Sequence, residues 1–432
     1  MGLLSFLEDW LRSNNVKNTN RNRRGITYYK PSHISGFVGD DGYQNNIICS
    51  GGSSELRSEM IASLCIVATN ANVPIIILHQ GDTDLTNRLR SVYTKHSAYI
   101  EINSNSYYFD PFYDMTRQQI SKIIVDTSPQ KYNMTSDAEA FIDVITGLIE
   151  YRGRNVCLHD MADCPASKLS LAVQNIASKY ALAPSVVSEL QINLAQGQAE
   201  SRKVMAYLKE LYVECANFLP QHKSDYQKCV SLPYIVKHGM VMNFNVVSEQ
   251  NTLLLRIIAE QLQLLVRNRQ MFYLVIDDIP VTDENSLSKI CNGRSGSIKY
   301  AMCSGDLYSI CGGDEKMFGS VLGSSKKWFV FQHTSGISAD KWSGAFTKYK
   351  KIGVTTNHSR HKGGGWGLGG PLFGKPFLNW NNNAGYQQGV SYKDEDEAVI
   401  RAEEIIRIPS RGGYIYSSDD REIAYVDHFL PF

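Results

Sequence analysis

A glycine loop between a short apolar strand and a helix constrains this chain more than any other feature. Asn46-Ile47-Ile48-Cys49 is predicted to be a buried strand, and residues 55–67 (ELRSEMIASLCIV) are predicted to be a helix. Ser50-Gly51-Gly52-Ser53-Ser54 lies between them as a tight loop of small residues. Strand, glycine loop and helix in this order form the frame in which backbone N–H groups hold nucleotide phosphates.

The phosphate-binding consensus G-x-x-x-x-G-K-[ST] fits this loop in two incomplete registers. If it begins at Gly51, Leu56 replaces the second Gly, Arg57 replaces the Lys, and Ser58 is retained. If it begins at Cys49, Glu55 takes the Lys position and Leu56 takes the Ser/Thr position. A unit charge pair at ~4 Å is worth about 4 kcal/mol at an effective dielectric of ~20, so Glu55 there would repel phosphate strongly. The first register predicts a nucleotide site formed by Gly51, Gly52, Ser53, Ser54, Arg57 and Ser58.

A second acidic signal follows a continuous apolar strand. Residues 271–276 (MFYLVI) end in Asp277-Asp278, which is the position of the Walker B carboxylates. Asp277 would orient Mg²⁺ together with Ser58, and Asp278 would activate the attacking water. The alternative is a pair of acidic residues that cap the next turn, since Pro280 follows at once.

Alternating strands and helices predict an α/β fold with a mainly parallel central sheet. The domain that contains this sheet is predicted to comprise 36–158 and 226–432, and an all-α module to be inserted at 159–225. Gly- and Asn-rich residues 362–393 show no period, and 362–370 is predicted to be a surface or channel-lining loop. The expected strands are 46–49, 74–79, 98–102, 106–109, 241–247, 271–276, 298–303, 328–332, 405–408, 414–416 and 422–426.

Charge, cysteines and hydropathy limit the possible partners. A formal net charge of +1 excludes a general basic coat for nucleic acid, so any DNA contact must be local. Nine cysteines without metal-ligand spacing indicate a reduced cytoplasmic protein. The sequence has no unbroken apolar run of ~20 residues, which is the length that a membrane-spanning helix needs. No such helix is therefore expected.

The N-terminal residues 1–35 are predicted to be an amphipathic helix followed by a basic linker. Leu3, Leu4, Leu7, Trp10 and Leu11 share one helical face. Such a helix either lies on the inner face of an anionic membrane or docks on its own domain or on a neighbour, and we favour docking.

Taken together, the order of these segments resembles the cytoplasmic part of type IV coupling proteins and the related FtsK/HerA translocases. The resemblance covers residue 36 to the end. It implies a RecA-like P-loop ATPase that binds ATP and Mg²⁺ and assembles as a hexamer or with a related ATPase. It also implies DNA or protein cargo bound by the all-α module, and membrane-associated secretion components as partners. Arg294 is similar to the family's arginine finger, although a solvated turn arginine is an equal alternative. The segments that carry the resemblance are 46–67, 107–112, 159–225, 274–278, 328–334 and 405–409.

Departures from the family decide between three functional hypotheses. The loop lacks Gly-Lys, Asp278 stands where the family has Glu, and Ser304-Gly305-Asp306 stands where a Gln sensor is expected. The favoured hypothesis is a degenerate ATPase that recruits or passes substrate in a conjugative DNA-transfer or type IV secretion machine. One alternative is a catalytically dead scaffold subunit. Another is an active DNA translocase that uses Arg57 in place of the Walker Lys.

Overall fold

A ten-stranded sheet forms the centre of the larger of two compact units. The computed structural model describes residues 14–102, 107–291, 298–372 and 375–431, with the side chains of 223 and 353–392 excepted. The larger unit comprises 27–341 and 402–432. The strands of its sheet, in spatial order, are β1 (Ile26–Tyr29), β15 (Glu422–Val426), β14 (Gly413–Ser417), β11 (Lys327–Val330), β3 (Ile47–Ser50), β10 (Lys299–Ser304), β9 (Tyr273–Asp277), β4 (Ile75–His79), β8 (Val241–Asn245) and β5 (Tyr99–Glu101).

Seven neighbouring strands of this sheet, β11 to β5, run parallel, and β14 adds an antiparallel strand beside β11. Strands β3, β4 and β9 are buried along their whole length, as expected of near-continuous Ile, Leu and Val runs covered on both faces. The predicted α/β fold with a mainly parallel sheet is therefore confirmed. Because all seven strands end at one edge, Ser50, His79 and Asp277 are brought to the same side of the sheet.

Helix α3 (Ser54–Asn70) packs between the sheet and α4 (Thr83–Val92), and its Met60, Ile61 and Leu64 belong to the main hydrophobic cluster. Its N-cap, Ser53, accepts a hydrogen bond from the Leu56 N–H, which fixes where the helix begins. Helix α12 (Thr252–Arg267) has its own Leu, Ile and Ala side chains buried along most of its length.

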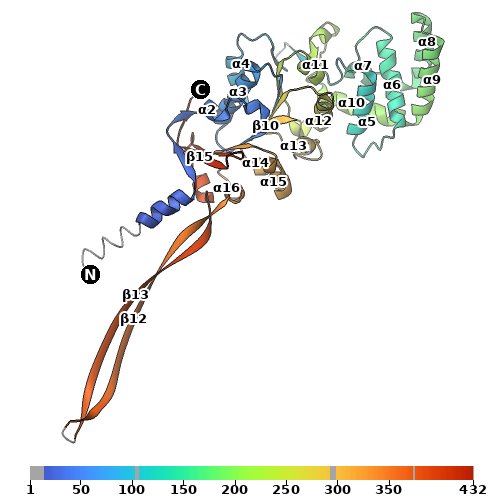
Figure 1. Ribbon diagram of the computed structural model, residues 1–432. Helices are drawn as coiled ribbons and strands as arrows, with labels where there is room; N and C mark the ends of the chain where they lie inside the picture. The colour runs from blue at the N-terminus through green and yellow to red at the C-terminus, as the bar shows by residue number, and fades with distance from the viewer. Residues whose placement is uncertain (1–13, 103–106, 292–297, 373–374, 432) are drawn as a thin grey trace. The chain divides into compact units, whose positions relative to one another are not determined.

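Helices gather at one end of the larger unit (Figure 1). Helices α7 to α10 occupy the segment predicted to be all-α, α6 from the preceding segment packs against α9, and α5 packs against α6. The helical layer therefore includes residues N-terminal to 159, while the domain boundary at that residue stays a prediction. The helices are α5 (Arg117–Thr127), α6 (Asp137–Glu150), α7 (Leu158–Ala162), α8 (Leu169–Tyr180), α9 (Pro184–Gly197) and α10 (Ser201–Cys215).

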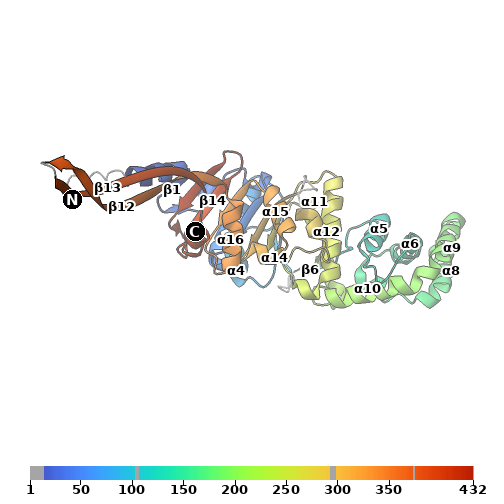
Figure 2. The same ribbon diagram turned by 90° about the horizontal axis from the view of Figure 1, so that it is seen from below.

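The smaller unit comprises residues 1–26 and 342–401, and a long hairpin dominates it. Strands β12 (Lys348–Leu372) and β13 (Lys375–Ala398) lie side by side (Figures 1 and 2). The prediction of an irregular loop at 362–370 was therefore wrong. Glycine lowers strand propensity, and cross-strand pairing overrides that local preference here.

Two shorter strand predictions also differ from the structure. The residues predicted as a strand at 405–408 begin inside helix α17 (Ala402–Ile406), because a short apolar run does not distinguish strand from helix. The strand expected at 106–109 is β6 (Tyr108–Phe109), which pairs with β7 (Cys229–Val230) instead of joining the main sheet. Among the described residues, no helix combines the length and apolar character that crossing a bilayer requires.

Candidate functional site

The glycine loop is short and tightly packed. Gly51, Gly52 and Ser53 alone separate the end of β3 from the start of α3. Both glycines have positive φ, 84° and 71°, which favours glycine strongly. A Cβ atom on Gly51 would lie 2.6 Å from the backbone oxygen of Gln332, and one on Gly52 would lie 2.9 Å from the Phe331 side chain. The loop is therefore pressed against the segment that follows β11.

The N–H groups of the two glycines are already hydrogen-bonded within the protein. The Gly51 N–H donates to the Ser304 carbonyl at 2.9 Å, and the Gly52 N–H donates to the Gln332 carbonyl at 2.8 Å. A phosphate cradle uses backbone N–H groups of this kind. These two N–H groups could bind a phosphate only if their hydrogen bonds to the Ser304 and Gln332 carbonyls were broken.

The start of α3 places an acidic residue at the mouth of the loop. Glu55 lies in the first helical turn, where the backbone N–H groups attract anions, and its carboxylate is 3.5 Å from the Arg411 guanidinium. Leu56 is fully buried and offers no oxygen to a metal. The first turn of the helix therefore presents a carboxylate where a phosphate-binding protein presents a cation.

Arg57 points to the edge of the sheet and pairs with the Asp-Asp motif. Its Nη2 is 2.8 Å from Asp278 Oδ2, its Nε is 3.8 Å from Asp277 Oδ1, and its Nη1 donates to the Gly52 carbonyl at 3.1 Å. Burial lowers the pKa of Arg57, but the charges of Asp278 and Asp277 outweigh burial and raise it. The guanidinium is therefore permanently charged and links the glycine loop to the end of β9.

Asp277 is fully buried, and its pKa is well above the usual carboxyl range. Burial is the main cause, followed by the negative charge of Asp278, while the positive charge of Arg57 acts in the opposite direction. Nearby, Asp82 Oδ1 accepts from the Ser54 hydroxyl at 2.9 Å and from the Leu85 N–H at 2.8 Å.

Asp278 is held in an unusual backbone conformation. Its φ of 53° lies in the left-handed region, which is uncommon for residues other than glycine. Its Oδ1 accepts the Gly305 N–H at 2.8 Å while Oδ2 contacts Arg57. Both carboxylate oxygens are thus engaged by the protein.

The proposed magnesium ligands do not converge. The Ser58 hydroxyl donates to the Ser54 carbonyl at 2.8 Å, and Ser58 lines a cavity of about 290 Å³ together with Asp84 and Arg88 of α4. Asp277 instead contacts Arg57, whose positive charge would repel a dication placed between the two carboxylates. The described residues therefore do not fit a bound Mg²⁺–ATP. Arg294 lies outside the described residues.

Several residues of this edge escaped the sequence analysis. Asp82 is the N-cap of α4, three residues after the end of β4, and an Asp between a predicted strand and a predicted helix was the available signal. Glu59 is fully buried on α3 and contacts Arg411 at 2.6 Å and Arg88 at 3.4 Å, a pairing across 352 residues that the sequence does not reveal. His333 lies 3.2 Å from the Ser50 hydroxyl, and burial lowers its pKa to about 4, so it is neutral.

A polar cavity of about 330 Å³ lies at the carboxyl ends of β4, β5 and β8. Asn243 is 1% exposed and lines it together with His79, whose pKa burial lowers to about 4. Arg90 and Glu101 form a two-contact ion pair at its rim, at 2.9 and 2.7 Å. Crevices at this edge of a parallel sheet are common ligand sites.

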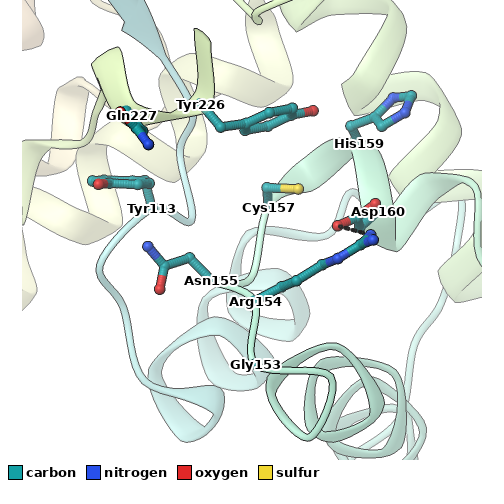
Figure 3. Close-up of a pocket in the computed structure, with 9 residues that line it drawn as sticks. All are labelled: Tyr113, Gly153, Arg154, Asn155, Cys157, His159, Asp160, Tyr226 and Gln227. Atoms are coloured by element: carbon teal, nitrogen blue, oxygen red, sulfur yellow. Dashed lines mark ion pairs between the residues drawn. The ribbon is translucent and has the colours of Figure 1, made fainter. Parts of the chain in front are cut away.

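A larger cavity of about 440 Å³ lies beside the helical layer (Figure 3). Cys157 faces it, but burial raises the pKa of that thiol to about 12, so it is not a thiolate at neutral pH. Arg154 and Asp160 form an ion pair of 3.9 Å at one side. This cavity shares no lining residue with the Arg57 cluster. The lining residues are Tyr113, Gly153, Arg154, Asn155, Cys157, His159, Asp160, Tyr226 and Gln227.

Comparison with known proteins bears on the fold alone. No family model and no curated protein sequence matches this chain. The structure is similar to the unbound bacterial conjugative coupling protein TrwBdeltaN70, with 12% identity, a TM-score of 0.52, and coverage of 91% of this chain and 86% of that one. It is also similar to the plasmid coupling protein TrwB in complex with the non-hydrolysable ATP analogue ADPNP, with 11% identity, a TM-score of 0.52, and coverage of 96% and 92%.

A third structure, TrwB with the non-hydrolysable GTP analogue GDPNP, matches with 12% identity and a TM-score of 0.51, covering 95% of this chain and 91% of that one. The fold is thus that of the coupling protein TrwB, and the predicted RecA-like architecture is confirmed. At this identity the likeness does not extend to the residues of the site.

Proposed function

We propose that this chain is a coupling-protein-like subunit of a conjugative DNA-transfer or type IV secretion machine that keeps the RecA-like fold as a scaffold and does not turn over ATP. The TrwB-like fold supports the process, because TrwB is a conjugative coupling protein. The contact of Arg57 with Asp278 and Asp277 carries the proposal against catalysis, since it occupies the carboxylates that would bind and activate Mg²⁺ and water.

The loop supports the same conclusion independently of Arg57. The N–H groups of Gly51 and Gly52 are used by backbone carbonyls, and Glu55 adds a negative charge to the helix N-terminus. An anion that binds there loses the two glycine donors and meets a like charge. In this role the chain recruits DNA or protein cargo through the helical layer and assembles with itself as a hexamer or with a related ATPase. Membrane-associated secretion components would be further partners.

Calorimetry with Mg²⁺–ATP tests the absence of nucleotide binding. We expect no saturable heat from the parent protein up to ~1 mM ATP, which corresponds to binding weaker than about 4 kcal/mol. The measurement is repeated with Arg57→Ala, and with Arg90→Ala as a control at an exposed ion pair away from the loop. An active P-loop ATPase in the same buffer shows that the assay detects binding.

The competing hypothesis of an active translocase predicts a different pattern. If Arg57 replaced the Walker Lys, the parent would bind ATP, Arg57→Ala would abolish binding, and Arg90→Ala would retain it. That result would overturn the scaffold proposal. Mass photometry of the same samples, with and without DNA and a related ATPase, measures assembly: a subunit that stays monomeric in every mixture would contradict the proposed role in an assembly.

A further inference from the structure

The hairpin of β12 and β13 forms a two-stranded sheet of its own, and no third strand pairs with either within the described residues. An isolated two-stranded hairpin is marginally stable in water, because it lacks a hydrophobic core. A pair of strands this long therefore needs something else to cover at least one of its faces.

The base of the hairpin is tied to the rest of its unit. The Asn20 side chain donates to the Ile352 carbonyl at 3.2 Å and accepts the Ile352 N–H at 2.8 Å. Arg23 pairs with Asp394 at 3.0 Å, and Lys350 pairs with Asp396 at 2.7 Å. Charged residues of both strands are thus used at the base, next to the helical residues 14–23.

The distal part of the hairpin has almost no charge. From Gly363 to Tyr392 the sequence contains one charged residue, Lys375, at the turn. A basic group precedes this stretch on β12, formed by His358, Arg360, His361 and Lys362. Thirty consecutive residues with a single charge are unusual for a sheet exposed to water, because solvated strands alternate apolar and polar residues.

Register places the distal residues on two different faces. Trp366 is paired with Trp380, and Leu368 with Leu378, so these four residues share one face of the ladder, which we call the tryptophan face. The next pair on the tryptophan face is Gly364 with Asn382, whereas three pairs that each join a Gly to an Asn lie on the other face, the glycine–asparagine face. These pairs are Gly363 with Asn383, Gly365 with Asn381, and Gly367 with Asn379. The alternation ends at Gly369 and Phe377, after which the register shifts.

We propose that the tryptophan face of the hairpin binds the interfacial region of a lipid bilayer. Trp is enriched at the membrane–water boundary, where its ring contacts acyl chains and its N–H contacts water or headgroups. A lone hairpin with unpaired edges cannot cross the hydrocarbon core, because its free N–H and C=O groups would lose their hydrogen bonds. The membrane–water interface accepts the Trp rings and also leaves the unpaired N–H and C=O groups of the strand edges within reach of water or headgroups. The glycine–asparagine face then lies toward the headgroups.

A further feature points to an anionic lipid surface. The basic group at 358–362 precedes the uncharged stretch, where it can contact acidic headgroups. Lipid is favoured over single-stranded DNA because DNA affinity depends on phosphate contacts, and the distal stretch offers one lysine.

Vesicle flotation of the full chain tests this proposal. Vesicles of phosphatidylcholine with 30% phosphatidylglycerol should carry the parent protein. The variant W366N/W380N/L368N/L378N should lose at least ~100-fold in partitioning, because four large apolar side chains no longer leave water. The matched control N379S/N381S/N383S changes the other face and should bind as the parent does. Equal binding by the first variant and the parent would overturn the proposal.

Fluorescence quenching locates the contact. Bromine near the headgroup end of the acyl chains should quench parent tryptophan emission more than bromine near the chain terminus. The variant W366F/W380F keeps an apolar face but should lose most of this quenching while still floating. Unchanged quenching would place the contact elsewhere, such as in residues 1–13, and would overturn the assignment to the hairpin.

Two other occupants give different outcomes. If a second copy of this chain covers the tryptophan face, the parent oligomerises without lipid and the four-residue variant is a monomer. The parent and the variant then show the same flotation. If single-stranded DNA covers it, the parent binds an oligonucleotide, the same variant does not, and flotation is again unaffected. Either result would overturn the lipid proposal.

Discussion

Arg57 shows how one side chain changes the chemistry of a phosphate-binding frame. It is 6% exposed, and it is bound to Asp278, Asp277 and the Gly52 carbonyl. Two positions earlier, the side chain of Glu55 is 59% exposed. The guanidinium instead reaches inward, where its fork can satisfy a carboxylate and a carbonyl together.

Replacing Arg57 with Met should lower the free energy of unfolding by about 2–3 kcal/mol, because a buried ion pair loses one partner. Urea denaturation followed by circular dichroism measures the change. The variant R57M/D278N should recover part of the loss, since the carboxylate of residue 278 is no longer left without its partner. Arg90→Met, at an exposed pair with Glu101, is the control and should have a much smaller effect. Equal effects of R57M and R90M would refute the structural role of Arg57.

At the scale of elements, Asp110 joins β6 to α7. It is fully buried, its Oδ1 accepts the Phe112 N–H at 2.9 Å, and its Oδ2 accepts the Leu158 N–H at 2.9 Å. Burial raises the pKa of Asp110 to about 6. The folded protein therefore binds a proton more tightly than the unfolded chain, and this contribution to stability falls as pH rises from about 4 to about 6.

The variant Asp110→Asn should remove this pH dependence. A shift of about two pKa units corresponds to about 3 kcal/mol. The free energy of unfolding of the parent, relative to that of D110N, should therefore fall by about 2–3 kcal/mol between pH 4 and pH 7. Asn also loses one acceptor, but that cost does not change with pH. Asp163→Asn, whose side chain is 69% exposed, should leave the slope unchanged. Parallel curves for D110N and the parent would contradict the prediction.

At the scale of the whole molecule, the main hydrophobic cluster lies within the larger unit. Among the described residues, the main hydrophobic cluster runs from Ile34 to Phe429 and includes no residue between 342 and 401. The smaller unit is built from the hairpin and the N-terminal residues. The larger unit should therefore fold without the distal hairpin.

A chain in which residues 360–386 are replaced by Asn-Gly tests this independence. Ser359 and Gln387 are register partners, so a two-residue turn can join them. The urea midpoint and the near-ultraviolet circular dichroism of the larger unit should match those of the parent, and vesicle flotation should be lost. A shifted midpoint or a loss of cooperativity would show that the hairpin contributes to the main fold.

The sequence by itself determined the α/β architecture, the glycine loop and the Asp-Asp strand end. Continuous apolar runs such as 75–78 and 273–276 are local signals of buried strands. Because they alternate with segments of helical period, few arrangements of the sheet are compatible with the sequence. It predicted Asp277 and Asp278 as a pair and found Arg57, but it left the register of the loop open between Gly51 and Cys49. Arg294 stays a prediction.

Only the tertiary structure decided what these residues contact. The Gly51 and Gly52 N–H groups bond to the end of β10 and to the segment after β11, and Glu59 pairs with Arg411, so these contacts join residues far apart in the chain. The hairpin was missed for the same reason, since its glycine-rich strands are defined by their cross-strand partners. Periodicity is local and can be read from the sequence, whereas hydrogen-bond partners and charge pairs depend on which strand ends meet at one edge of the sheet.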